Sequence, residues 1–236
     1  MTATPTNAVI DISHYNTQVD FAQAKAGGIM GVIQKATQGA AYVDPTYATR
    51  RPEAEAAGLL WGAYHFGTGD DVTTQVENFL ATVGPDNGSM LLVLDFEENT
   101  GGSSMTLDQA RDFVSAVQAR TGRWPGFYSS NSYVSSMLDG PDSVLSHCWF
   151  WLARYDSTPE VPSAWPTWTL WQYTDGSAGE EPYDCPGVGP CDRDQYNGDA
   201  TQLTQFWEAG GVASVSSFPP GPARAGRRSA PGPCRS

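Results

Sequence analysis

Two carboxylates separated by one residue follow the most apolar run of the chain. Residues 91–97 read Leu-Leu-Val-Leu-Asp-Phe-Glu, which predicts a buried strand that ends in Asp95 and Glu97. Because side chains alternate along a strand, both acids are expected on one face, with Cα atoms about 6.5–7 Å apart. Like charges this close raise the pKa of one group. The pair could therefore supply one protonated acid and one ionised carboxylate to a single reaction.

Other acids also stand at the ends of predicted strands. Asp11 ends the first apolar run, and Asp192 and Asp194 lie on the last one. A single acid in such a place more often caps the next helix. If the strands close into a barrel, however, Asp11, Asp95, Glu97 and Asp192 converge on one mouth. Gathering four carboxylates there is costly, so we interpret the cluster as a functional site.

The residues around these acids favour a carbohydrate groove. Oxygen ligands could also hold Mg²⁺, and magnesium-dependent chemistry is the main competing use of the cluster. No Gly-rich phosphate loop, GxSxG or HExxH motif occurs, the three histidines form no zinc-like pair, and we expect no metal or other cofactor. Aromatic side chains in or beside strand ends can stack on sugar faces. The candidates for substrate binding are Tyr64, Phe66, Tyr128, Trp151, Tyr155 and Trp171.

Strands and helices alternate along the first 130 residues. The predicted strands are 8–13, 29–36, 59–66, 90–96 and 126–129, and the predicted helices between them are 19–26, 45–57, 71–83 and 106–120. After residue 146, three further strands at 148–153, 167–173 and 192–196 are joined by Pro-rich and Gly-rich loops, and 199–209 is predicted to be a last helix. This α/β rhythm predicts a parallel sheet, either open and doubly wound or closed into a barrel.

Composition limits the partners and the domain count. The chain has 236 residues and a net charge of −13, which disfavours nucleic acid and anionic membrane surfaces. It shows no apolar run of about 20 residues and no visible secretory signal. We expect one domain over residues 1–210, a monomer, and a disordered tail rich in Ser, Pro, Gly and Arg over residues 211–236.

The four cysteines allow three complete pairings. Cys185 and Cys191 bracket a Pro-Gly-Val-Gly-Pro loop that is short enough for a local disulfide bond. We predict this bond, which would hold the loop just before Asp192. The pairing of Cys148 and Cys234 stays open.

From about Val9 to Gly198 the chain resembles the glycoside hydrolase family 25 lysozymes, the Ch-type N-acetylmuramidases. The likeness rests on the order and spacing of seven segments, which together are highly specific: Asp11-Ile-Ser13, Gln34-Lys-Ala-Thr37, Gly62-Ala-Tyr-His-Phe66, Leu94-Asp-Phe-Glu97, Trp151-Leu-Ala-Arg-Tyr155, Trp171-Gln-Tyr173 and Asp192. The resemblance implies an α/β fold, an irregular TIM-like barrel of roughly five β/α units followed by three strands with few helices.

The resemblance also implies an activity and roles for the site residues. The substrate would be the glycan strands of peptidoglycan, cleaved at the β-1,4 bond between N-acetylmuramic acid and N-acetylglucosamine. Glu97 would be the general acid. Asp95 would either attack the anomeric carbon or orient the substrate's 2-acetamido group as the nucleophile, and we favour the second route. Asp11 and Asp192 would hold the sugar or tune Glu97, and Tyr64 and Tyr128 would contact the acetamido group.

Two positions depart from the family pattern. Gln38 stands where the second-strand motif usually has Glu, which removes a carboxylate. The last motif reads Asp192-Arg193-Asp194 instead of Asp-x-Asn, so either acid could face the site.

Two alternatives to a muramidase stay open: a non-catalytic sugar-binding barrel and a chitinase-like glycosidase. The intact Asp95 and Glu97 pair argues against the first, since a binding module has no need of a costly acid pair. The fuller acidic strand signature of a chitinase is missing. The substrate and the acidic composition favour an extracellular protein that works at mildly low pH, where Glu97 stays protonated.

Overall fold

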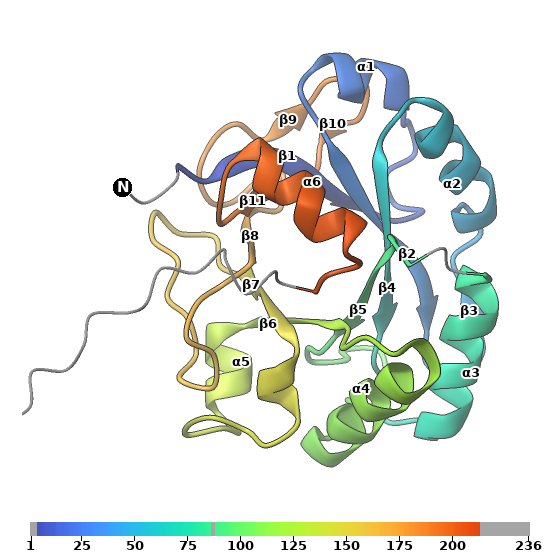
Figure 1. Ribbon diagram of the computed structural model, residues 1–236, viewed down its shortest axis with the longest axis vertical. Helices are drawn as coiled ribbons and strands as arrows, with labels where there is room; N and C mark the ends of the chain where they lie inside the picture. Colours follow the sequence, from blue (N-terminus) through green and yellow to red (C-terminus); the bar gives the residue numbers. More distant parts are fainter. Residues whose placement is uncertain (1–3, 86–87, 213–236) are drawn as a thin grey trace, which may run out of the picture.

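The strands of this protein close into a barrel (Figure 1). The computed structural model describes residues 4–85 and 88–212. In this part of the chain, the strand order β1-β11-β8-β7-β6-β5-β4-β2 forms a ring, because β2 pairs back to β1. All neighbours from β1 through β2 and β4 to β8 are parallel, and β11 is antiparallel to both β8 and β1. The barrel is thus closed, and the open-sheet alternative is excluded.

Five β/α units make up the first part of the barrel. They are β1 (Thr6–Ile12) with α1 (Phe21–Ala26), β2 (Gly31–Gln38) with α2 (Tyr47–Ala56), β4 (Leu60–Phe66) with α3 (Val72–Val83), β5 (Leu91–Asp95) with α4 (Leu107–Thr121), and β6 (Gly126–Ser130) with α5 (Asn131–Ser135). Three strands then complete the ring: β7 (Trp149–Ala153), β8 (Leu170–Thr174) and β11 (Asp192–Tyr196). The predicted architecture of five units followed by three strands with few helices is confirmed.

The remaining elements are short or lie at the ends. The sequence analysis missed β3 (Tyr42–Val43), which pairs with the end of β2, the hairpin of β9 (Asp184–Cys185) and β10 (Gly189–Pro190), and the 3₁₀ turn at Leu145–His147. It also missed α5. The predicted last helix is present as α6 (Ala200–Glu208), which begins after a capping box formed by Asp199 and Gln202.

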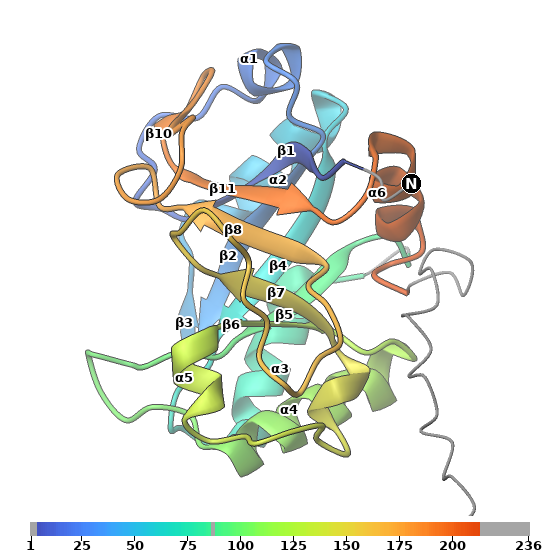
Figure 2. The same cartoon turned by 90° about the vertical axis from the view of Figure 1, so that its left-hand side faces the viewer.

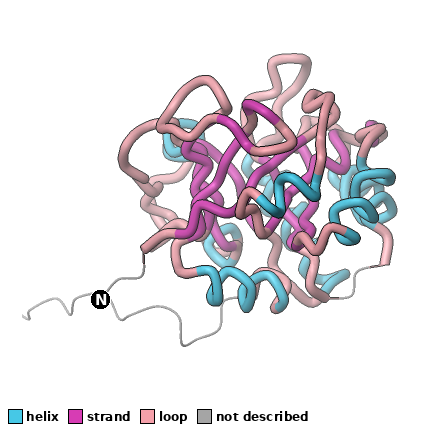
Figure 3. The backbone as a smooth tube through the Cα atoms, turned by 90° about the horizontal axis from the view of Figure 1, so that it is seen from above, coloured by secondary structure: helices cyan, strands magenta, loops and turns pink. Residues whose placement is uncertain are grey.

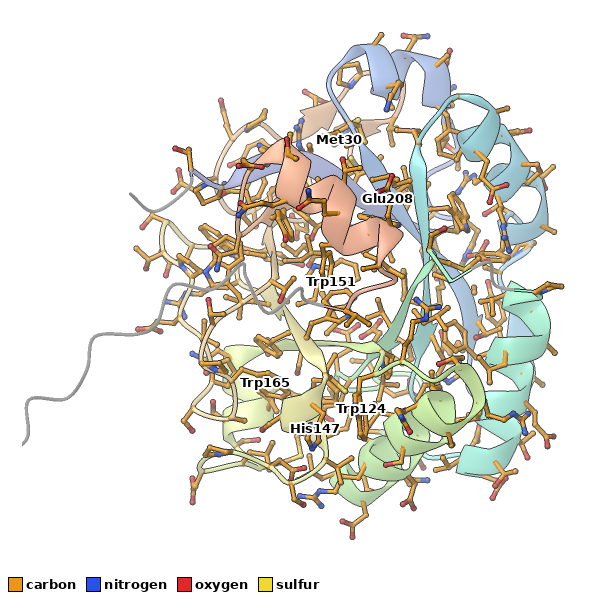
Figure 4. The ribbon with its side chains drawn as sticks, in the orientation of Figure 1. Met30, Trp124, His147, Trp151, Trp165 and Glu208 are labelled. Atoms are coloured by element: carbon orange, nitrogen blue, oxygen red, sulfur yellow. The ribbon has the colours of Figure 1, made fainter. Side chains whose placement is uncertain are left out.

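Alternation along the strands divides the apolar side chains into two layers. Leu92, Leu94 and Phe96 belong to the larger cluster, which packs between the strands and the helices. Leu91 and Val93 belong to the smaller cluster inside the barrel. In Figure 4, Trp151 lies inside the ring of strands and Trp165 lies outside it. Figure 3 shows the strands in the centre with helices and loops around them. Residues 91, 93 and 95 thus form an inward-facing series.

Helix α6 closes one end of the barrel. Leu203, Phe206 and Trp207 on this helix belong to the interior cluster, and Trp207 Nε1 donates a 2.8 Å hydrogen bond to the carbonyl of Trp61. Figure 2 places α6 at the end opposite the β9–β10 hairpin. The other end, where the parallel strands finish, remains accessible to a ligand.

The predicted disulfide bond between Cys185 and Cys191 is not formed, and that prediction is wrong for this structure. Both cysteines are free and buried. Their thiols hydrogen-bond to each other, and this bond lowers the pKa of Cys185. Backbone hydrogen bonds close the loop instead, including a 3.0 Å bond from the N–H of Val188 to the carbonyl of Cys185. Cys234 lies outside the described residues.

No helix within the described ranges combines the length and the apolar character that a membrane span requires. Residues 213–236 lie outside the described part of the chain, so the expected disordered tail and the exact domain limit stay predictions.

The contact between Gly31 and α6 gives a test of this packing. A Cβ atom added at Gly31 would lie 2.5 Å from the buried ring of Trp207, which is 1% exposed and cannot move freely. We expect Gly31→Ala to lower the free energy of unfolding by about 1–3 kcal/mol, measured by urea denaturation. Gly140→Ala is the control, because nothing lies within 4 Å of its added Cβ. Equal stability of the two variants would contradict this account of the closed end.

Candidate active site

A cavity of about 210 Å³ opens where the parallel strands end. Side chains from seven of the eight barrel strands line it, together with Glu97 and Tyr155, which lie two residues past the ends of β5 and β7. The lining residues are Asp11, Tyr64, Asp95, Glu97, Tyr128, Trp151, Tyr155, Gln172 and Asp192. In Figure 2 this is the side of the β9–β10 hairpin, away from α6. Eight of the ten predicted site residues are among those that line it.

Strand β5 brings Asp95 and Glu97 to this cavity together. Asp95 continues the inward series of Leu91 and Val93, and Phe96 packs outward against Phe127. The backbone hydrogen bonding between β5 and β6 extends past the end of β5, since the N–H of Phe96 donates a 2.9 Å hydrogen bond to the carbonyl of Tyr128. Glu97 therefore keeps the alternation and lies on the same side as Asp95. The predicted placement of the two acids on one face is confirmed.

Burial raises the pKa values of both acids. Asp95 is buried, and its pKa lies well above the usual Asp value because of burial and the charge of Glu97. The pKa of Glu97 is also raised, chiefly by burial. Within residues 4–85 and 88–212, Oδ1 of Asp95 has no hydrogen-bond partner. The pair thus holds a proton more readily than exposed carboxyls do, and it presents an unused acceptor.

Lys35 is the cation beside this pair. Its Nζ donates a 2.7 Å hydrogen bond to Oε1 of Gln38 and lies 4.9 Å from the ring centroid of Phe66. Burial lowers the pKa of Lys35, whereas the charges of Asp95, Asp44 and Glu97 raise it. Lys35 in turn lowers the pKa of both Asp95 and Glu97. One proton shared by the two acids leaves a single negative charge, which the ammonium group balances.

Gln172 on β8 organises the opposite wall. Its Nε2 donates a 2.7 Å hydrogen bond to Oδ2 of Asp11. Its Oε1 accepts hydrogen bonds of 2.8 Å from the hydroxyls of Tyr128 and Tyr155. A single amide therefore fixes one carboxylate and two tyrosines, which come from three other strands or strand ends. The arrangement holds these polar groups in place before a ligand arrives.

The register between β1 and β11 places Asp192 and Asp194, the two acids of the last motif, at different depths in the barrel. Asp192 pairs with Asp11 and lines the cavity, whereas Asp194 pairs with Val9, one layer further inside. Asp194 is fully buried and accepts a 2.6 Å hydrogen bond from Nε1 of Trp151. Asp192 is therefore the acid that faces the cavity.

Repulsion within this group of acids adds to the effect of burial. The pKa of Asp11 is raised well above its usual value by burial and by the charges of Asp192 and Asp194. Burial and the charge of Asp175 raise the pKa of Asp192 to about 6. The pKa of Asp194 is also raised well above its usual value, by burial and by the charge of Asp192. These acids therefore keep their protons to higher pH than exposed carboxyls do.

Two predicted substrate-binding residues lie outside the cavity. Trp171 alternates with the inward-facing Gln172, so it points outward, packs edge-on against Trp168 and donates from Nε1 to the carbonyl of Arg154. The structure does not place Trp171 in the cavity, and its contact with substrate stays a prediction. Phe66 is not part of the lining either, because its ring lies under the ammonium group of Lys35.

Lys35 and Gln172 are the functional residues that the sequence analysis missed. Both stand inside segments that were singled out, 34–37 and 171–173, yet neither is acidic or aromatic. Strand alternation was the available signal, since position 172 lies on the opposite face from the two aromatic residues beside it. No group of three or more His, Cys, Asp or Glu side chains in the described residues is arranged to hold a metal ion. The absence of a cofactor stays a prediction.

Comparisons with known proteins agree on one family. The model of the glycosyl hydrolases family 25 matches residues 10–181. Lysozyme M1 of Streptomyces globisporus is 32% identical over 209 residues, which cover 82% of this chain and 69% of that protein. The N,O-diacetylmuramidase of Arthroderma benhamiae is 30% identical over 212 residues, with 85% and 86% covered. A bacterial lysozyme structure from Streptomyces coelicolor superposes with a TM-score of 0.76 at 29% identity, covering 88% of this chain and 99% of that one.

The position of Lys35 predicts how the acid pair titrates. A positive charge stabilises the ionised form of a carboxyl, so replacing Lys35 with Met removes that stabilisation. We expect Lys35→Met to raise the pKa values of Glu97 and Asp95, so that both hold their protons to higher pH. Carboxyl ¹³C shifts followed through a pH titration measure this. Lys25→Met is the control, because Lys25 is the only other lysine and bonds to the carbonyl of Gly58. Unchanged or lowered pKa values in Lys35→Met would refute the assignment.

Proposed function

The chain belongs to the glycosyl hydrolases family 25 and is a peptidoglycan hydrolase of the lysozyme (muramidase) class, and from this premise we propose which residues carry the reaction. We propose that it cleaves the β-1,4 bond between N-acetylmuramic acid and N-acetylglucosamine, with Glu97 as general acid and Asp95 as the assisting carboxylate. The observation that carries the proposal is the pair of adjacent acids with raised pKa values in a cavity lined by aromatic side chains.

Glu97 is the proton donor in this proposal. It is only half-buried and lines the cavity, so its carboxyl can reach a glycosidic oxygen that lies there. Its raised pKa keeps the proton available at mildly acidic pH. Protonation of the glycosidic oxygen lets the C–O bond break and the leaving sugar depart as an alcohol.

Asp95 assists the other half of the reaction. Its unpaired Oδ1 accepts the N–H of the substrate's 2-acetamido group, and the acetamido oxygen attacks the anomeric carbon as the bond to the leaving group breaks. Water, deprotonated by the now ionised Glu97, then opens the cyclic intermediate. The net configuration at the anomeric carbon is retained.

Electrostatics favour this route over direct attack by Asp95. A carboxylate nucleophile must be ionised, and Asp95 is buried beside Glu97 in a site that already gathers five acids. An acetamido oxygen brings no negative charge of its own. A covalent adduct of the sugar on Asp95, seen by mass spectrometry, would identify the direct route instead.

The other lining residues hold the sugar. Gln172 fixes the hydroxyls of Tyr128 and Tyr155, and Asp11 accepts from the same amide, so these groups offer a preset hydrogen-bonding surface. Tyr64 and Tyr128 contact the acetamido group, and Trp151 and Tyr155 supply ring surface for the sugar. Asp192 also lines the cavity, and burial and the charges of Asp175 and Glu97 raise its pKa to about 6, so the ionised forms of Asp192 and Glu97 disfavour each other.

The proposal also covers setting and partners. Peptidoglycan lies outside the cytoplasm, so we propose that the protein acts extracellularly, as a monomer on glycan strands, without a nucleic-acid or membrane partner. A non-catalytic sugar-binding barrel or a chitinase-like glycosidase would give different outcomes in the experiment below.

Replacement of the general acid tests the function directly. We expect wild-type protein to clear a cell-wall suspension, and Glu97→Gln to lose activity by a factor of at least about 10², because the proton donor is gone. Glu98→Gln is the matched control, since Glu98 is exposed and does not line the cavity. Clearing by Glu97→Gln at the wild-type rate would remove Glu97 as the acid. Release of chitin oligomers in place of muropeptides would favour the chitinase alternative.

The raised pKa of Glu97 sets the pH dependence. Activity needs the protonated acid, so kcat/KM falls as the pH rises through the pKa of Glu97, which lies above the usual Glu value. We expect an optimum on the acidic side of neutrality, measured as a kcat/KM profile on solubilised peptidoglycan. An optimum well above neutral pH would contradict the role of Glu97 as the donor.

A further inference from the structure

An exposed group of aromatic side chains lies next to the cavity without lining it. We call His14, Tyr15 and Tyr42 the rim cluster. Tyr15 is 79% exposed and Tyr42 is 40% exposed, although most aromatic side chains of the described residues are buried. The ring centroids of His14 and Tyr15 are 4.1 Å apart, and those of His14 and Tyr42 are 6.1 Å apart. The cluster thus presents ring faces to solvent from the turn after β1 and from β3.

The cluster stands on the same end of the barrel as the acid pair. His14 and Tyr15 follow β1 directly after Asp11, and Tyr42 on β3 pairs with Gln38 at the end of β2. Lys35 connects the two places, since its Nζ lies 5.8 Å from the ring of Tyr42 and 4.9 Å from the ring of Phe66. Phe66 pairs with Asp95 in the ladder of β4 and β5. Lys35, whose charge also acts on Asp95 and Glu97, therefore lies between the rim cluster and the acid pair.

A buried carboxylate holds His14, against which both tyrosine rings lie. Asp44, whose side chain is fully buried, lies 2.9 Å from Nδ1 of His14 and accepts a 3.0 Å hydrogen bond from the backbone N–H of the same residue. Its other oxygen accepts from the N–H and the hydroxyl of Thr46. The hydroxyl of Tyr42 lies 3.1 Å from Nδ1 of His14. A surface held in this way loses little conformational entropy when a ligand binds.

The cavity alone is too small to hold much of a polymer. Its volume of about 210 Å³ is below the range of roughly 300–1,000 Å³ that is usual for pockets enclosing a drug-sized ligand. A glycan strand must therefore continue along the surface on both sides of the cleaved bond. The rim cluster is an exposed aromatic surface that such a strand meets as it leaves the cavity.

We propose that Tyr15 and Tyr42 form an additional sugar-binding subsite, on which a pyranose ring of the glycan strand stacks, beyond the two sugars that flank the cleaved bond. This inference rests on the proposed function, and it adds a dependence on chain length that the acid pair does not explain. Substrates long enough to reach the rim cluster bind better than short ones. The reaction at Asp95 and Glu97 is the same for both.

Charge favours a sugar over the peptide part of the substrate as the occupant. The charge of Asp44 acts on Tyr42, and the chain carries a net charge of −13. A peptide with several free carboxylates is therefore disfavoured there. An N-acetylglucosamine ring is neutral, and its C–H face matches the face of a tyrosine ring.

The experiment compares two lengths of peptide-free glycan made of alternating N-acetylglucosamine and N-acetylmuramic acid, a tetrasaccharide and an octasaccharide or longer. We expect Tyr15→Ala to lower the ratio of kcat/KM on the long glycan to kcat/KM on the short one by about three- to tenfold. Val212→Ala, an exposed position that follows α6 at the closed end, should keep the wild-type ratio. The same ratio in Tyr15→Ala and wild type would overturn the subsite.

A second variant separates stacking from other roles. Tyr15→Phe keeps the ring and loses the hydroxyl, so it should retain the wild-type ratio. A loss in Tyr15→Phe as large as that in Tyr15→Ala would overturn the stacking contact.

Binding without turnover separates this inference from the proposed function. In the Glu97→Gln background, Tyr15→Ala should reduce retention on insoluble peptidoglycan by a similar factor, measured by co-sedimentation. If wild-type protein cleaves neither glycan, the proposed function fails, and the co-sedimentation result still decides the subsite. Equal retention with and without Tyr15→Ala would reject it.

Discussion

Repulsion between carboxylates at the open end of the barrel is the constraint on which the rest of this structure depends. Asp11, Asp95, Glu97, Asp192 and Asp194 come together because β1 and β11 are neighbours and β5 faces them across the ring. Burial raises the pKa values of all five, and repulsion adds to this effect at Asp11, Asp95, Asp192 and Asp194. Bound protons, the ammonium group of Lys35 and the amide of Gln172 reduce the repulsion that remains. The same burial that opposes folding keeps a proton on Glu97 for the reaction.

The apolar layers below the site hold these groups together. Leu91 and Val93 pack inside the barrel, and Leu92 and Leu94 pack outside it, so β5 is held on both faces before it presents Asp95. Helix α6 adds Trp207 to the interior layer from the opposite end. Hydrophobic burial at one end thus offsets the unfavourable electrostatics at the other. The packed barrel thus holds in place a site in which buried acids repel each other.

The long periodic elements and the acids could be predicted from the sequence, because their signals are local. Alternation over residues 91–97 placed Asp95 and Glu97 correctly, and the β/α rhythm gave the five units and three strands. The short β3 and the β9–β10 hairpin have two residues in each strand, too few for a period to appear. Trp171 was misplaced because its aromatic type outweighed the alternation with Gln172. The pairing of Asp192 rather than Asp194 with Asp11 depends on register between β1 and β11, which no local pattern fixes. The place of Lys35 in the site could not be predicted, because it depends on how close Lys35 lies to Asp95 and Glu97, which are far along the chain.

The closure of one end of the barrel by α6 has a consequence for how a polymer is handled. With Leu203, Phe206 and Trp207 filling that end, the barrel offers no tunnel through which a strand could be threaded. A long molecule must instead be laid across the mouth and released from the same side. Such a geometry needs no free chain terminus for a strand to engage the site.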